Sequence, residues 1–247
     1  MENNKDFKTK KFLLPEKSTK NFERDILNPE GVLAPYGVEH LGIDLIEKVY
    51  FDTVDRFFFS NGVIINLVKS KSSKLNKIVV RFEGEDKRIP FVSYMPTSLS
   101  KEIEKKDFFS EHFDFIVNAI KDIMPAGLSV DIASYVNTII PVFVVIKNAN
   151  KYRIINNNGL KMQFSFERVE YINNATRNKH KLLQFEIRLE SGDKEELFEK
   201  FIKRLVLQVP TIIPMKDSDL LNGLDYTSIT NNTKEEANKN NKKTPKK

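Results

Sequence analysis

The sequence predicts an α+β fold in which antiparallel strands are covered on the outside by helices. Three observations support this class: several stretches are β-branched or alternate apolar with polar residues, polar loops separate them, and two longer segments repeat apolar residues at helical spacing. Because no Pro- or Gly-rich linker divides residues 7–225, we expect one domain there. A flexible stretch at 1–6 and a disordered Lys- and Asn-rich tail at 226–247 would flank it.

Five segments are predicted strands. Residues 62–69, 77–82 and 139–147 are rich in β-branched residues and lie between polar turns. Residues 160–171 and 182–190 alternate apolar with polar side chains, and a polar loop joins them. Such a pair is typical of a long antiparallel hairpin.

The last predicted strand carries charge along one whole face. Its apolar face is formed by Phe185, Ile187 and Leu189, and its polar face by Gln184, Glu186, Arg188 and Glu190. A polar face of this kind can look at water, as in an open sheet, or into the polar interior of a barrel or tunnel. The residues alone leave both arrangements open.

Two segments are predicted helices, at residues 107–124 and 194–207. In each, the apolar residues recur three or four positions apart and so lie on one face of a helix. The stripe of the first is Phe109, Phe113, Ile116, Val117, Ile120, Ile123 and Met124, and that of the second is Leu197, Phe198, Phe201, Ile202 and Leu205.

The basic pI near 9.2 arises from the two ends of the chain. Residues 1–11 have four Lys and two acids (+2), and residues 234–247 have six Lys and two Glu (+4), which together equal the formal net charge of +6. The body is therefore neutral, which argues against a nucleic-acid surface over its whole extent, although RNA could contact the basic ends.

Composition and missing motifs exclude several classes of function. The absence of Cys excludes disulfides and thiolate metal sites. No apolar stretch is long enough to span a membrane and no signal-like segment is present, so we expect a cytoplasmic protein. Phosphate-binding glycine loops, HExxH and GxSxG are absent. Any catalysis must rest on carboxylates, Lys and Arg.

Residues 49–69, VYFDTVDRFFFSNGVIINLVK, resemble the CYTH, or triphosphate tunnel metalloenzyme, superfamily. Similar segments lie in the family's order at 11–16 (KFLLPE), in the helical region at 97–124, and in the hairpin and helix from FSFERVEY to FEIRLESGDKEELFEKFIKRL (164–205). The matching residues of the first motif are Tyr50, Phe51, Asp52, Thr53 and Gly62. We expect Asp52 and Thr53 to form a structural turn, and Phe57, Phe58 and Phe59 to pack in the core or on a surface covered by a helix.

The resemblance implies an antiparallel eight-stranded β-barrel or tunnel with helices packed outside. In such a tunnel Lys and Arg grip a triphosphate, and glutamates hold Mg²⁺ or Mn²⁺, which activates water. Carried over position by position, it implies phosphate-binding roles for Lys11, Arg81, Arg88, Lys147, Arg153 and Arg188. It implies metal-binding roles for Glu167, Glu186 and Glu190.

The sequence departs from the family pattern at the metal site. The two glutamates of the N-terminal motif fall at Phe7 and Thr9, and a glutamate of the last strand is replaced by Arg188. A fixed positive charge there repels a divalent cation. We therefore expect a protein that binds a triphosphate- or polyphosphate-type anion with degraded or no metal-dependent hydrolysis.

Three alternatives remain open at this point. One is an active, divergent triphosphatase that uses Mg or Mn and acts on inorganic triphosphate, a nucleotide or an RNA 5′ end. Another is a non-catalytic structural or assembly subunit with a protein partner. The third concerns the candidate site residues themselves. In it, Glu186, Arg188, Glu190 and the other cations are part of an ordinary solvated surface with weak ion pairs.

Overall fold

The computed structural model describes residues 8–14, 19–28, 30–72, 75–83, 90–96, 107–124, 131–190, 194–215 and 218–224. Arg88 and the two ends expected to lack structure, 1–6 and 226–247, lie outside the described residues.

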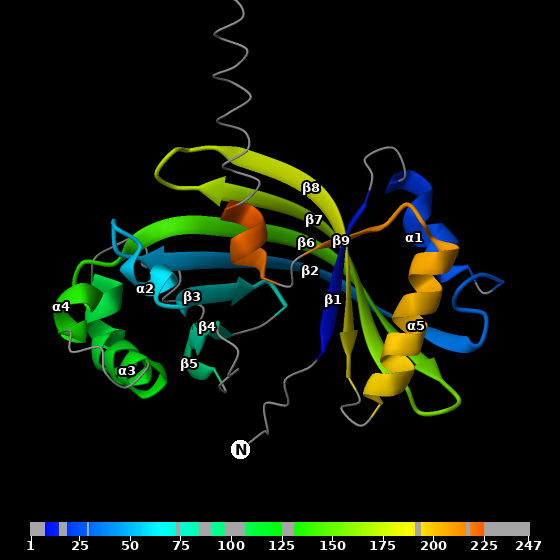
Figure 1. Ribbon diagram of the computed structural model, residues 1–247, viewed down its shortest axis with the longest axis horizontal. Helices are drawn as coiled ribbons and strands as arrows, with labels where there is room; N and C mark the ends of the chain where they lie inside the picture. The colour runs from blue at the N-terminus through cyan, green and yellow to red at the C-terminus, as the bar shows by residue number, and fades with distance from the viewer. Residues whose placement is uncertain are drawn as a thin grey trace, which may run out of the picture. The chain divides into compact units, whose positions relative to one another are not determined.

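Within the described residues, nine strands form one sheet (Figure 1). The order across the sheet is β5-β4-β3-β2-β6-β7-β8-β1-β9. Their bounds are β1 Thr9–Leu14, β2 Tyr36–Asp52, β3 Val63–Ser70, β4 Leu75–Phe82, β5 Phe91–Pro96, β6 Ile140–Asn156, β7 Lys161–Asn173, β8 Lys179–Leu189 and β9 Ile213–Met215.

The sheet confirms the antiparallel strands and corrects the closed eight-stranded barrel. The pairs β1–β8, β1–β9, β2–β3, β3–β4, β4–β5 and β7–β8 are antiparallel. Among the described strands β5 and β9 are the two edges, so the ladder is not closed. The additional edge strand, β9, has only three residues, too few for alternation to reveal it in the sequence.

The long helices agree with the apolar stripes. The helices are α1 Thr19–Leu27, α2 Phe57–Ser60, α3 Asp107–Ile123, α4 Ile132–Val136 and α5 Glu195–Gln208, and residues 219–224 are also helical. The predictions at 107–124 and 194–207 correspond to α3 and α5. None of the described helices is long and apolar enough to cross a membrane.

The described residues fall into two compact units. Residues 44–146 belong to the first unit, and residues 8–43 and 147–224 to the second. The boundaries fall within β2 and β6, so each of these strands contributes to both units.

The first unit has its own hydrophobic core. Apolar side chains of β3 and β4, including Ile65 and Val80, pack with Ile116 and Ile120 of α3. Phe58 of α2 is fully buried in this cluster, as expected for the Phe57–Phe59 stretch. The helical face predicted from the apolar spacing in α3 is therefore the face that covers the sheet.

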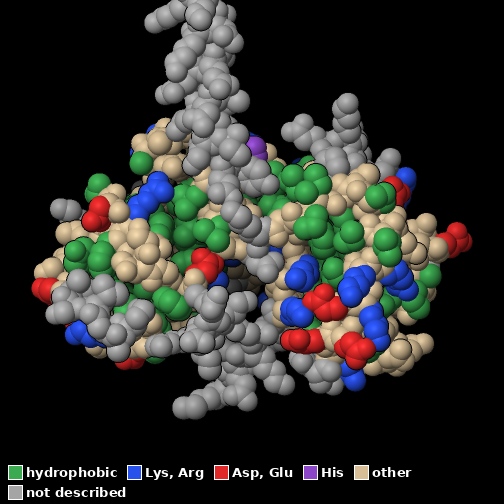
Figure 2. Space-filling view, in the orientation of Figure 1, with side chains coloured by type: hydrophobic (Ala, Val, Ile, Leu, Met, Phe, Trp, Pro, Cys, Tyr) green, Lys and Arg blue, Asp and Glu red, His purple; other side chains and the backbone are tan. Residues whose placement is uncertain are grey.

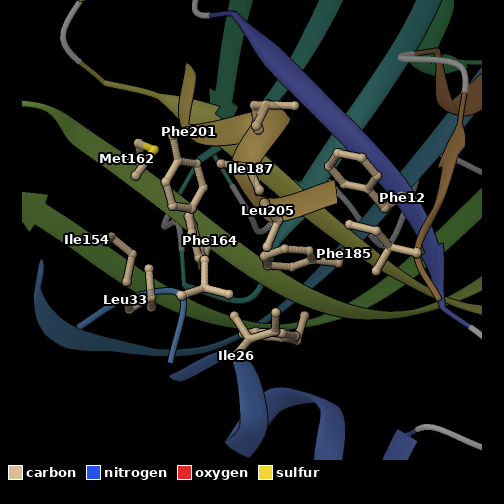
Figure 3. Close-up of a cluster of buried hydrophobic side chains, with 14 of the residues drawn as sticks. Phe12, Ile26, Leu33, Ile154, Met162, Phe164, Phe185, Ile187, Phe201 and Leu205 are labelled. Atoms are coloured by element: carbon tan, nitrogen blue, oxygen red, sulfur yellow. The ribbon is translucent and has the colours of Figure 1, made fainter. Parts of the chain in front are cut away.

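The core of the second unit lies between the β7–β8 hairpin and α5 (Figure 3). The hairpin register pairs Phe166 with Phe185. The Phe164 ring lies 5.1 Å from that of Phe185 and 5.8 Å from that of Phe201 on α5. Because one face of the hairpin is fixed by this packing, alternation turns its polar residues to the other face.

The outer face of α5 is highly charged with both signs. Figure 2 shows blue and red side chains intermingled in this region. Lys8 lies 2.8 Å from a Glu199 carboxylate oxygen, and Lys200 lies 2.6 Å from Glu196. This is an ordinary solvated helix face, and such exposed pairs contribute little to stability.

Gly62 joins α2 to β3 in a conformation that disfavours other residues. Its φ is +73°, and a Cβ would lie 3.0 Å from Cε2 of Phe82. We expect Gly62→Ala to lower the free energy of unfolding by about 1–2 kcal/mol, measured by urea denaturation. Gly37→Ala is the matched control, because a Cβ there would lie 3.7 Å from its nearest neighbouring atom, the Ile155 carbonyl oxygen. Equal effects of the two substitutions would contradict the assignment of strain to Gly62.

Candidate functional site

The polar face of the β7–β8 hairpin meets the N-terminal strand in the second unit. In the register, Glu186 of β8 lies opposite Ser165 on β7 and Lys11 on β1, and Gln184 lies opposite Glu167. Residues opposite each other in neighbouring strands have their side chains on the same face of the sheet. The ladder therefore gathers Lys11, Glu167 and Glu186 on one face.

Lys147 of β6 is buried among three carboxylates, with 3% of its side chain exposed. Its Nζ lies 3.1 Å from Glu167 Oε2, 2.8 Å from Asp219 Oδ1 and 3.9 Å from Glu186 Oε2. Burial opposes the charged form, but the carboxylates of Asp219, Glu167 and Glu186 outweigh it and hold the pKa of Lys147 well above its ordinary value. The ammonium group therefore stays charged.

Lys11 is also buried, and it contacts Asp219 as Lys147 does. Its Nζ lies 2.6 Å from Asp219 Oδ1 and 3.7 Å from Glu186 Oε2. One carboxylate oxygen, Asp219 Oδ1, thus contacts the ammonium groups of both Lys11 and Lys147. We call these five residues the lysine–carboxylate cluster: Lys11, Lys147, Glu167, Glu186 and Asp219.

Glu167 is held in place by hydrogen bonds from the hairpin itself. The Ser165 hydroxyl donates to its Oε1 at 2.8 Å, and the Gln184 side-chain amide donates to its Oε2 at 2.5 Å. Tyr171 donates in turn to the Gln184 Oε1 at 3.3 Å. Gln184 and Glu167 are both buried, so this part of the hairpin's polar face is an interior network and not a solvated surface.

Asp219 was not among the predicted site residues. It opens the helical residues 219–224, where Ser218 accepts a hydrogen bond at its carbonyl oxygen from the Asn222 N–H, 3.1 Å away. A Ser followed by an acid and a short apolar run is a helix-start signal. The signal is weak here because the run is short and borders the polar C-terminal tail.

The other predicted cations have different partners. Arg153 lies 3.0 Å from Glu190 and 3.3 Å from Glu39. Glu190, expected as a metal ligand, is thus paired with Arg153, which was expected to bind phosphate. Arg188 donates to the Gln163 side-chain oxygen at 2.8 Å. Arg81 belongs to the first unit and pairs with Glu83 at 3.3 Å.

The cluster combines two ammonium groups with three carboxylates. With all five groups ionised its net charge is −1. Lysine ammonium groups donate in several directions and bind phosphate as point charges. Within the described parts of the chain, no three Asp, Glu or His side chains are arranged so that they could hold a metal ion. The cluster thus places two ammonium groups against an excess of carboxylates of the same chain.

Comparison with known proteins identifies the fold. No protein-family model and no curated protein sequence matches the chain. A Hippeastrum protein assigned as an adenylyl cyclase, described as having a dominant triphosphatase activity, has a TM-score of 0.53 at 12% identity over 89% of this chain and 95% of that chain. A Bacillus halodurans protein assigned as an adenylate cyclase has a TM-score of 0.50 at 10% identity over 85% of this chain and 93% of that chain. The chain therefore shares the fold of these two proteins.

Proposed function

We propose that the lysine–carboxylate cluster binds a triphosphate- or polyphosphate-type anion through Lys11 and Lys147. The observation that carries the proposal is the single oxygen, Asp219 Oδ1, held 2.6 Å from one ammonium group and 2.8 Å from the other. A phosphate oxygen has the same charge sign and hydrogen-bonding capacity and suits the same position. The triphosphatase activity described for the Hippeastrum protein of the same fold agrees with this class of ligand.

We further propose that metal-dependent hydrolysis is degraded or absent. Carboxylates are suitable ligands for Mg²⁺ or Mn²⁺ by type. However, Lys147 Nζ lies within 3.9 Å of both Glu167 and Glu186, and a divalent ion bound beside them would be repelled by that ammonium group. Glu190 is engaged by Arg153. The residues present therefore fit a divalent ion poorly.

Calorimetry with sodium tripolyphosphate tests the binding site. We expect binding without Mg²⁺, and we expect Lys11→Met to weaken it about tenfold or more, because hydrogen bonds to charged groups are worth about 1.5–3 kcal/mol. Lys8→Met is the matched control. Lys8 directly precedes β1, the strand that carries Lys11, and its ion-pair partners are Glu195 and Glu199. Its affinity should stay within about twofold of wild type.

Two results would overturn the proposal. Equal affinities for Lys11→Met and Lys8→Met would place the anion elsewhere. Fast phosphate release from tripolyphosphate, a nucleoside triphosphate or a 5′-triphosphorylated RNA that depends on Mg²⁺ or Mn²⁺ would favour an active triphosphatase instead.

A further inference from the structure

We infer that residues 218–224 are an intrinsic competitor for the anion site: Asp219 occupies the position of an anion oxygen and must withdraw when a polyphosphate binds. This inference rests on the proposed function. It adds that the chain regulates the site with a carboxylate of its own C-terminal region.

The origin of the three carboxylates supports this role for Asp219. Glu167 and Glu186 lie within strands whose register is fixed by the β7–β8 ladder. Asp219 lies in the helical residues 219–224, outside the sheet. It is the carboxylate of the cluster that can leave without breaking a strand pair, although it makes the shortest contacts with both lysines.

The charge balance makes Asp219 and a polyphosphate mutually exclusive. With Asp219 in place, three carboxylates face two ammonium groups in a buried setting. Another strongly negative group would then be repelled over a few ångströms with little screening. Withdrawal of Asp219 raises the net charge of the cluster from −1 to 0 and frees the shared position between the lysines.

Three buried residues of the segment that carries Asp219 are polar: Ser218, Asp219 and Asn222. Its buried apolar side chain, Leu220, belongs to neither of the two hydrophobic core clusters, and Leu221 is 41% exposed. The preceding strand, β9, pairs with β1 over only three residues. Segments with few core contacts open at lower free energy than the core strands. A ligand that competes for the lysines can therefore displace this segment while the sheet stays folded.

Hydrogen–deuterium exchange on the full-length chain tests the displacement directly. We expect saturating tripolyphosphate to speed exchange of the amides in residues 220–224, including the Asn222 N–H bonded to Ser218. Amides of the β7–β8 hairpin should stay protected. Unchanged or slower exchange in 220–224 with bound tripolyphosphate would overturn the inference.

Asp219→Asn gives an independent test by calorimetry. Removal of the negative charge should tighten tripolyphosphate binding about tenfold. Glu170→Gln is the matched control, because Glu170 is also a carboxylate between two lysines, Lys179 at 3.6 Å and Lys181 at 3.9 Å, outside the cluster. It should leave the affinity unchanged.

The outcomes separate the two proposals. If wild type and Asp219→Asn bind tripolyphosphate equally, the anion site survives and the competitor role is wrong. If neither binds, both are wrong. If only Asp219→Asn binds, the anion site and the competitor role are supported but the binding expected for wild type is wrong, since the wild-type site is then closed by its own carboxylate. Should Asp219→Asn fail to fold, the exchange experiment on the wild-type chain decides.

Discussion

Replacement of Lys147 with Met is expected to lower the free energy of unfolding by about 3–5 kcal/mol. Met preserves most of the length of the side chain but removes its charge. In the variant, Asp219 and Glu186 still have Lys11 nearby. Glu167 loses the Lys147 ammonium group, which lies 3.1 Å from its Oε2 in the wild type, and its side chain is only 4% exposed. A buried carboxylate without a cation is costly because the desolvation of its charge is no longer offset. Urea denaturation followed by circular dichroism measures the loss.

A double-mutant cycle with Glu167→Gln identifies the pair responsible. Gln at 167 is neutral and keeps an oxygen that can accept from Gln184 or Ser165. Lys147→Met with Glu167→Gln should therefore be more stable than Lys147→Met alone. A coupling energy of about 1–3 kcal/mol is expected for groups in direct contact. Additive losses would show that Glu167 is not the group left uncompensated.

The dependence on pH follows from the raised pKa of Lys147. Burial lowers this pKa, but the three carboxylates raise it by more than burial lowers it. The pKa of Lys147 in the folded chain therefore exceeds its pKa in the unfolded chain. A raised lysine pKa stabilises the fold fully below the unfolded value, about 10.5, and this stabilisation is lost as the pH rises through the folded value. The difference between wild type and Lys147→Met should stay constant from pH 7 to 9.

Lys179→Met is a suitable control for loss of a lysine. Lys179 is on β8, is 60% exposed and pairs with Glu170 at 3.6 Å. Its removal should change the free energy of unfolding by less than about 0.5 kcal/mol. A comparable loss for both variants would indicate a general effect of charge and would contradict the role assigned to burial.

The sequence predicted the elements whose pattern is set by a neighbouring core. The β7–β8 hairpin and α5 share Phe164, Phe185 and Phe201, and burial of these rings imposes the alternation and the helical stripe that the sequence displays. In β2, by contrast, residues 37–41 are all exposed, so no alternation marks its first half. No strand was therefore predicted there, and only the end of β2 coincides with a motif, Tyr50–Thr53.

The residues of the lysine–carboxylate cluster follow from the sequence pattern only in part, for a similar reason. Positions that alternate toward the polar face, such as Glu167 and Glu186, follow from the hairpin. The partner of Lys11 is Asp219, 208 positions away, and no local pattern encodes a contact over that separation. Arg81 shows the opposite case, because its partner Glu83 lies only two positions away in the sequence.

Asp52→Ala is expected to lower the free energy of unfolding by about 3 kcal/mol through the backbone of the first unit. The Asp52 carboxylate accepts hydrogen bonds from the N–H groups of Thr53 at 2.7 Å, Phe58 at 2.9 Å and Phe59 at 2.9 Å. It thereby caps α2 and fixes the turn before it. These contacts agree with the structural role expected for the acid of the YFDT motif.

The cost of this substitution is large because Asp52 is fully buried. Burial raises the pKa of its carboxyl, and the three N–H donors offset only part of that effect. Ala would leave these donors without their acceptor in a site that water reaches poorly. Asp52→Asn should cost less, about 1–2 kcal/mol, because one oxygen remains for Thr53 and Phe58 while the amide group faces the Phe59 N–H.

Asp131→Ala provides the matched comparison within the same unit. Asp131 caps α4 by accepting from the Ser134 N–H at 3.3 Å and the Ser134 hydroxyl at 2.6 Å, but it is exposed. Its loss should cost about 0.5–1 kcal/mol, since water can replace the cap. Urea denaturation of the three variants should therefore rank Asp52→Ala below Asp52→Asn and both below Asp131→Ala. If Asp52→Ala proves no more harmful than Asp131→Ala, burial of the motif's acid does not stabilise this unit, and its place in the sequence needs a different reason.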